Sequence, residues 1–316
     1  MFTGRNSYIT SNSERAHDGL QTHVREDGFI YPEYLKALGY RTRHHGKCHI
    51  GTAKFMSAFG ENDSPWDRWS PPWFDDDGYS SFLESKSING FSFFREIHGR
   101  SPLGQCKGNF LGRWVRAKGD KPFPKEATYP AYIADMALAG LWACHGSDRP
   151  FYFQIDWFEP HQPFFIPSGM EEREREMRAS LALSLSWAMT NNGDPNLGLR
   201  LPLVYERYRK YWGLSELRTV EDYLVANALK YEVLDEQVGR VLSWLKNKGL
   251  YDDCLVMVTA DHGEMNCRGG LVDKGAFLNP RVLQVPLYLK MPIDCEGDAG
   301  VPMHGTSIHR AVSYLM

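Results

Sequence analysis

The sequence lacks a long hydrophobic run, since its 316 residues contain no stretch of about 18 consecutive apolar positions. A helix that crosses a lipid bilayer needs about 20 such residues, and the N-terminal segment is polar from Arg5 onward, unlike a secretory signal. We therefore expect no membrane partner. The compartment stays unknown from the sequence, and the printed residues by themselves predict a cytoplasmic protein without a signal peptide.

An excess of charge of either sign is also missing, because 36 basic residues are balanced by 39 acidic ones. Domains that bind nucleic acid usually carry a clustered basic surface, so we expect no nucleic-acid partner. Aromatic residues make up 13% of the chain, which argues against a disordered protein. The sequence does not indicate an oligomeric state.

Cysteine is scarce and irregularly spaced. No two cysteines stand in a Cys-x-x-Cys pair, which excludes both a disulfide framework and a cysteine-based zinc site. We expect unpaired thiols. The six cysteines are Cys48, Cys106, Cys144, Cys254, Cys267 and Cys295.

Hydrophobic periodicity predicts alternating helices and strands along the chain. Apolar residues recur every three or four positions in the helices, and short apolar or β-branched runs mark the strands. The predicted helices are a short one stopped by Gly39, Tyr129–Cys144 and Val220–Lys248, and the predicted strands are Phe151–Phe158, Leu255–Thr259 and Val285–Leu289. This order predicts an α/β fold with a large mixed, mainly parallel sheet flanked by helices. The first of these strands is apolar enough to be buried on both faces.

A single domain is expected over residues 1–316, with one long irregular excursion at about 60–120. The part from Gly60 to Gly90 is rich in proline, tryptophan, aspartate and serine. Such a composition is typical of a segment without regular secondary structure.

Ionisable residues follow three of the predicted strands or strand-like segments. Asp261 and His262 follow the strand 255–259, His161 follows the strand 151–158, and Lys47 and His49 follow the segment 40–43. A lone histidine after a strand is more often a hydrogen-bonded loop residue than a catalyst. Three such endings at one sheet edge are a stronger signal, because ligands of open α/β sheets gather at the carboxyl ends of the strands.

The residue types at these ends suit one kind of chemistry. A carboxylate beside a neutral imidazole can hold a divalent metal, and a lysine is a point charge suited to a tetrahedral oxyanion such as sulfate or phosphate. A histidine that is free of metal can transfer protons near neutral pH. Together these groups predict a metal-assisted hydrolase of an anionic ester.

Motifs at the same positions resemble those of the sulfatases, a family of the alkaline phosphatase superfamily. The segment Gly46-Lys-Cys-His-Ile-Gly51 is similar to the family's Gly-Lys-Trp-His-Leu-Gly, and Phe158-Glu-Pro-His-Gln-Pro163 resembles its Pro-His-x-Pro turn. The segment Val258-Thr-Ala-Asp-His-Gly-Glu-Met265 resembles the strand that ends in Asp-His-Gly or Asp-Asn-Gly. Asp273-Lys-Gly275 and Gln284-Val-Pro-Leu287 then follow in the family's order.

The resemblance implies a role for each of these residues. Asp261 and His262 would bind the metal, Lys47 and Lys274 would contact the sulfate oxygens, His49 would bond the nucleophile's hydroxyl group, and His161 would assist the leaving group. By family the metal would be calcium. The histidine of Asp-His-Gly is typical of the branch that includes choline-sulfatase-like and phosphonate-ester hydrolases, for which manganese or zinc also fits. The implied partner is a small sulfated substrate.

The nucleophile of the family does not occur among the printed residues. Sulfatases oxidise the cysteine of a Cys-x-Pro-Ser-Arg motif to formylglycine, and no cysteine here has a proline two positions later. Thr3-Gly-Arg5 resembles the segment that follows this motif, so the cysteine would precede Met1. We therefore expect a partial catalytic domain trimmed at both ends, without the first strand and the C-terminal subdomain, and inactive alone. Alternatives are a phosphonate or phosphodiester hydrolase of the same superfamily and a non-catalytic, anion-binding remnant.

A tryptophan-rich segment at 64–74 follows the Lys47 motif closely. Indole rings stack on sugars and cap quaternary ammonium groups, so we hypothesise that Trp66 or Trp69 forms a wall of the substrate pocket. The simpler interpretation is that these rings pin a long loop to the domain.

Overall fold

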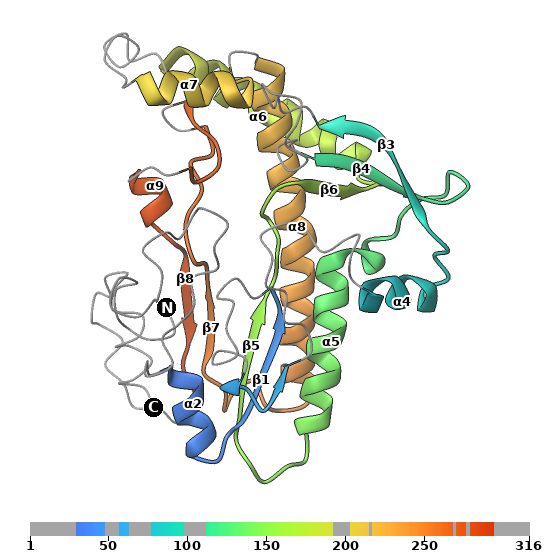
Figure 1. Ribbon diagram of the computed structural model, residues 1–316, viewed down its shortest axis with the longest axis vertical. Helices are drawn as coiled ribbons and strands as arrows, with labels where there is room; N and C mark the ends of the chain where they lie inside the picture. The colour runs from blue at the N-terminus through green and yellow to red at the C-terminus, as the bar shows by residue number, and fades with distance from the viewer. Residues whose placement is uncertain are drawn as a thin grey trace.

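The protein is described here from a computed structural model (Figure 1), which describes residues 30–47, 57–62, 77–97, 112–191, 203–214, 217–267, 270–275 and 279–293. The helices are α2 (Tyr31–Ala37), α4 (Asp77–Ser85), α5 (Tyr129–Cys144), α6 (Glu171–Asn191), α7 (Leu203–Trp212), α8 (Leu217–Asn247) and α9 (Pro280–Leu283). The strands are β1 (Arg41–Gly46), β2 (Glu61–Asn62), β3 (Phe91–Ile97), β4 (Gly112–Ala117), β5 (Phe151–Asp156), β6 (Phe164–Pro167), β7 (Val256–Thr259) and β8 (Leu287–Lys290).

The α/β class predicted from the sequence is confirmed, and three of the five described strand pairings are parallel. These strands form three hydrogen-bonded groups, in the orders β2-β1-β5, β3-β4-β6 and β7-β8. The predicted helices at 129–144 and 220–248 are confirmed as α5 and α8. Gly39 follows α2 with a positive φ of 94°, as expected of a glycine that stops a helix.

The β2-β1-β5 sheet brings two of the predicted site segments to one edge. β1 and β5 pair in parallel register from Arg41 and Phe151 to Gly46 and Asp156. Their carboxyl ends therefore lie side by side. The helices α5 and α8 pack against each other, and α5 also packs on both strands (Figure 1).

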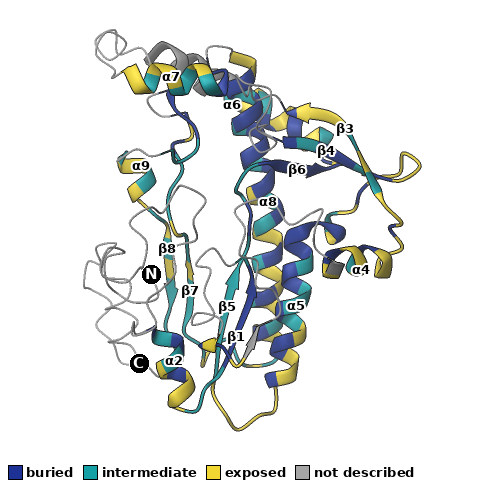
Figure 2. Cartoon of the chain, in the orientation of Figure 1, coloured by how far each residue is buried: buried dark blue, intermediate teal, exposed yellow. Residues whose placement is uncertain are grey.

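The burial predicted for β5 is wrong, because all six of its residues are only half-buried (Figure 2). Phe151, Phe153 and Ile155 pack toward α5 and α8. The alternate residues are polar and bond to one another, with the Tyr152 hydroxyl and the Gln154 amide donating along the strand. β5 is therefore an alternating strand, with one apolar face toward the helices and one polar face.

The segment at about 60–120, predicted to be irregular, contains α4, β3 and β4. The described aromatic residues of α4 and β3 pack in a core that they share with α5 and β6. Tyr79 and Leu83 of α4 pack with Val115 of β4 and with Phe165 of β6, all of them buried. Tertiary packing therefore overrides the weak local signal of a polar, proline-rich composition.

The last two strands, β7 and β8, do not form the parallel pair that a mainly parallel sheet would contain. β7 and β8 are antiparallel, with Val256 opposite Lys290 and Thr259 opposite Leu287. The chain between them passes through α9 and turns back, so β8 returns along β7 instead of crossing over. A crossover to a parallel neighbour usually needs an intervening helix of a dozen or more residues, whereas α9 has 4.

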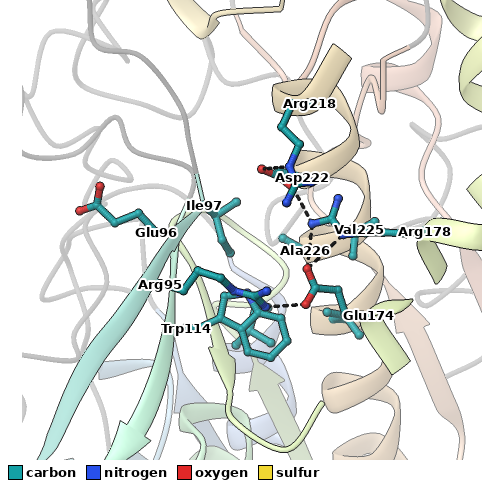
Figure 3. Close-up of a pocket in the computed structure, with 12 residues that line it drawn as sticks. Arg95, Glu96, Ile97, Trp114, Glu174, Arg178, Arg218, Asp222, Val225 and Ala226 are labelled. Carbon is teal, nitrogen blue, oxygen red and sulfur yellow. Dashed lines mark hydrogen bonds and ion pairs between the residues drawn. The ribbon is translucent and has the colours of Figure 1, made fainter. Parts of the chain in front are cut away.

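A charged cluster fastens α6 and α8 to the β3-β4-β6 sheet (Figure 3). Its ion pairs are Arg95–Glu174, Arg178–Glu174, Arg178–Asp222 and Arg218–Asp222. The cavity among these side chains measures about 20 Å³, which is room for about one water molecule. It is a structural junction rather than a substrate pocket.

No helix in the described part of the chain is long and apolar enough to cross a membrane. Within the same residues Cys144, Cys254 and Cys267 are free thiols, as expected for these three.

Candidate active site

Gly46 sets the position of Lys47 at the end of β1. A Cβ at Gly46 would lie 2.1 Å from the carbonyl oxygen of Asp156, and the residue has a φ of 98°. Only glycine can make this approach without a shift of the backbone. The Lys47 amide then donates a hydrogen bond of 2.7 Å to the same carbonyl oxygen, which extends the pairing of the two strands by one residue.

The side chain of Lys47 is half-buried among charged neighbours. Its Nζ lies over the ring of Phe158, 4.9 Å from the centroid. Burial lowers the pKa of the Lys47 ammonium, an effect that the carboxylate of Asp261 opposes and the ammonium of Lys274 reinforces. Two positive charges therefore act on one another here, which is the condition that a bound anion would relieve.

His161 and Lys274 are in direct contact, although 113 positions separate them in the chain. The Lys274 Nζ lies 2.9 Å from the His161 Nε2, and the His161 Nδ1 lies 2.5 Å from the carbonyl oxygen of Gln162. An ammonium can only donate, so Nε2 accepts and Nδ1 carries the proton. Burial, together with the charges of Lys274 and Lys47, lowers the pKa of His161 to about 3.

Asp273 connects the Lys274 segment to its surroundings. Its carboxylate accepts hydrogen bonds from the Gln162 amide at 2.8 Å and from the Tyr208 hydroxyl at 3.2 Å. Burial raises the pKa of Asp273, but the charge of Lys274 and the hydrogen bond from Gln162, with those from the backbone amides of Lys274 and Gly275, hold it below its ordinary value. The residue is therefore an anion that keeps the loops of His161 and Lys274 together.

The Asp-His-Gly segment follows β7 and lies against α9. A Cβ at Gly263 would lie 1.9 Å from the carbonyl oxygen of Arg281, and the Gly263 amide donates to the carbonyl oxygen of Val282 at 2.7 Å. This contact excludes a larger side chain at the third position of the motif. Glu264, the next residue, is half-buried, and its desolvation raises its pKa to about 7.

Asp261 and His262 could supply two ligands to a divalent metal. The Asp261 Oδ1 lies 3.8 Å from the His262 Nε2, and the Asp261 side chain is 80% exposed. The His262 Nδ1 lies 2.9 Å from the carbonyl oxygen of Gly263, and with its proton directed there Nε2 keeps the lone pair that a metal needs. The described residues contain no group of three or more histidine, cysteine, aspartate or glutamate side chains that could hold a metal.

The structure thus brings together four of the residues selected from the sequence. Lys47, His161, Lys274 and Asp261 act on one another through a hydrogen bond or through charge. His262 lies beside Asp261. His49, Trp66 and Trp69 lie outside the described residues, so their roles stay predictions.

Sequence reasoning missed three polar residues around this group. Asp273, Gln162 and Glu264 stand inside the quoted motifs, but no role was assigned to them. They could have been selected because they lie within two positions of Lys274, His161 and His262 in the sequence. Which of them points into the site depends on contacts such as that between Gln162 and Asp273, which span 111 positions.

The His161 imidazole is expected to stay neutral from pH 8 down to about pH 4, because burial and two lysines oppose its protonation. Since its folded pKa lies below the unfolded value near 6.5, this residue contributes stability above that pH, which is lost as the pH falls toward 3. Lys274→Met is expected to raise the pKa of His161. NMR of the imidazole nitrogens measures both values, and a wild-type midpoint near 6.5 would contradict the assignment.

Comparison with known proteins places these motifs in a family context. A family model described as Sulfatase matches residues 1–292. The uncharacterised sulfatase YidJ of Escherichia coli K12 is 26% identical over 263 residues, covering 82% of this chain and 46% of that protein. A multifunctional alkaline phosphatase superfamily protein, PehA of Trinickia caryophylli, is 24% identical over 216 residues, covering 61% of this chain and 37% of the relative. The chain thus spans less than half the length of these relatives.

Solved structures show the same fold. A phosphonate monoester hydrolase from Silicibacter pomeroyi superposes with a TM-score of 0.60 at 17% identity, covering 92% of this chain and 57% of that one. The phosphonate monoester hydrolase of Agrobacterium radiobacter gives a TM-score of 0.58, also at 17% identity, and the same coverage of both chains.

Proposed function

This chain belongs to the sulfatase family of the alkaline phosphatase superfamily, and we propose that it carries the oxyanion-binding part of a metal-dependent hydrolase of sulfate esters. The observation that supports this most directly is the cluster of Lys47, Lys274 and His161. Two ammonium groups and a neutral imidazole converge at the carboxyl ends of β1 and β5. We take the chain as part of one catalytic domain and a small sulfated molecule as its partner.

The two lysines supply positive charge where a sulfate group would lie. Each ammonium donates hydrogen bonds without accepting any, so each suits the non-bridging oxygens of an ester. Their mutual repulsion falls when an anion enters between them. The neutral His161 would then be free to exchange its contact with Lys274 for one with the leaving group.

Members of this superfamily depend on a metal, and Asp261 and His262 would hold it here. A divalent ion at this place would polarise a sulfate oxygen and stabilise the charge that develops on it. Calcium is the ion proposed for the site, with manganese or zinc as the alternative favoured by the imidazole ligand. Asp261 also counters the charge of Lys47, so one carboxylate would serve both the metal and the anion-binding lysine.

We expect the 316-residue chain to bind sulfate in the presence of calcium or manganese, and Lys47→Ala and Lys274→Ala to weaken this binding about 10- to 100-fold each. Each variant removes a charge-assisted hydrogen bond worth about 1.5–3 kcal/mol. Isothermal titration with sodium sulfate measures the affinity. Lys125→Ala is the control, because Lys125 pairs with Glu236 at the exposed surface.

Equal affinity in Lys47→Ala, Lys274→Ala and Lys125→Ala would contradict the proposal. The same titration with methylphosphonate tests the alternative of a phosphonate-ester hydrolase, which a clear preference for that ion would favour. Turnover of 4-nitrophenyl sulfate is measured in the same samples. No turnover is expected, because the family's nucleophile does not occur among the printed residues. Turnover that survives Lys274→Ala would place the chemistry elsewhere.

A further inference from the structure

Three buried polar residues form a row on one face of α8. Tyr223, Asn227 and Lys230 are spaced by four and three positions, which places them above one another on a helix. Their exposed fractions are 0%, 4% and 1%. A helix face packed inside a domain is normally apolar, and burying polar groups is unfavourable unless each finds a partner.

Each residue of the row bonds to a different loop of the candidate site. The Lys230 Nζ lies 3.0 Å from the Glu159 Oε1, and Glu159 stands two positions before His161. The Asn227 amide donates to the Asn266 Oδ1 at 3.1 Å, just after the Asp-His-Gly segment.

The third contact reaches the Lys274 segment. The backbone amide of Asp273 donates to the Tyr223 hydroxyl at 3.1 Å. A single rigid helix thus contacts the segments that carry His161, His262 and Lys274. Bonds from one α-helix fix the three segments relative to one another, since the spacing along the helix, about 1.5 Å per residue, is constant.

Two of the contacted residues have a strained backbone. Asn266 has a φ of 44° and Asp273 a φ of 62°. Left-handed conformations of residues other than glycine cost about 1–3 kcal/mol and persist where the surroundings enforce them. The row supplies this constraint, because Asn227 holds the side chain of the first residue and Tyr223 holds the amide of the second.

We propose that Tyr223, Asn227 and Lys230 are positioning residues that align the three site-bearing loops on α8. This proposal rests on the proposed function, because the three loops are taken to form one anion-binding site. The residues act through others: Tyr223 through Asp273, Asn227 through Asn266, and Lys230 through Glu159. The 2.9 Å contact between Lys274 and His161 is the geometry that the row would maintain.

Tyr223→Phe tests the proposal, since it removes the hydroxyl group and leaves the ring that packs edge-on against Phe164 at 5.3 Å. With the Asp273 amide released, Lys274 is expected to shift away from His161. The midpoint for protonation of His161, followed by NMR, should rise by about one pH unit, and sulfate affinity should fall about 10-fold. Val241→Ala is the control, because Val241 lies on the same helix in a separate apolar cluster. It should lower the melting temperature without moving the His161 midpoint.

An unchanged His161 midpoint in Tyr223→Phe would overturn the proposal, whatever happens to the melting temperature. So would an equal shift in Val241→Ala, which would reveal a general effect of lost stability. Asn227→Ala is the second variant and should shift the ring resonances of His262, because it frees Asn266; unchanged resonances would also count against the row.

The His161 readout requires no ligand, so it separates this proposal from the proposed function. If wild type binds no sulfate but Tyr223→Phe moves the His161 midpoint, the alignment by α8 stands and the anion-binding function falls. If sulfate binding depends on Lys274 but the midpoint is the same in both proteins, the function stands and the row is overturned.

Discussion

Lys230→Met is expected to destabilise the protein by about 3–5 kcal/mol, because it leaves a carboxylate buried without its counterion. The side chains of Lys230 and Glu159 are 1% and 2% exposed, and their charged atoms lie 3.0 Å apart. The second carboxylate oxygen of Glu159 is buried and has no hydrogen-bond partner among the described residues. Burial lowers the pKa of Lys230, which Glu159 opposes, so each charge depends on the other.

Urea unfolding followed by circular dichroism measures this loss. Lys125→Met serves as the matched control, since it breaks an exposed ion pair with Glu236 and should cost less than about 1 kcal/mol. The double variant Lys230→Met/Glu159→Leu should recover most of the stability, because an apolar pair can replace a buried ion pair at little cost. A single variant as stable as the control, or a double variant no better than the single one, would show that the pair is not coupled as described.

Gly46→Ala is expected to cost more than about 3 kcal/mol, because two effects add. A left-handed backbone costs an alanine about 1–2 kcal/mol, and the new Cβ would lie 2.1 Å from the Asp156 carbonyl oxygen. That oxygen belongs to the backbone of the paired strand and cannot rotate away. Relief of the clash would separate the ends of β1 and β5 and break the bond from the Lys47 amide.

Gly39→Ala isolates the first of these effects. Gly39 has nearly the same φ, 94° against 98°, but nothing lies within 4 Å of its hypothetical Cβ. It should cost about 1–2 kcal/mol. The difference between the two variants in the free energy of unfolding therefore measures the clash, and two equal losses would show that the close approach at Gly46 does not exist.

The local elements followed from the sequence because their causes are local. α5 and α8 have a helical period and begin or end at recognisable residues, such as Pro130 in the first turn of α5. The motifs around Lys47, His161 and Asp261 could be selected for the same reason. Each follows a strand. The strands before Lys47 and His161 pair in parallel and share one edge, whereas β7, before Asp261, pairs with β8 in a separate antiparallel group. Resemblance to a family then assigned roles that periodicity alone could not supply.

Some features depended on residues far apart in the chain. The apolar face of β5 is covered because α5 and α8 pack on Phe151, Phe153 and Ile155. The contacts of α4, β3 and β4 likewise join aromatic residues that lie far apart in the sequence. In the sequence, Lys230 cannot be distinguished from the other charged residues of the long helix α8. Its burial against Glu159, 71 positions away, exists only in the tertiary structure, because burial depends on which distant segment covers a side chain. The residue types therefore determined the chemistry available at the site, whereas long-range packing decided which of those groups meet.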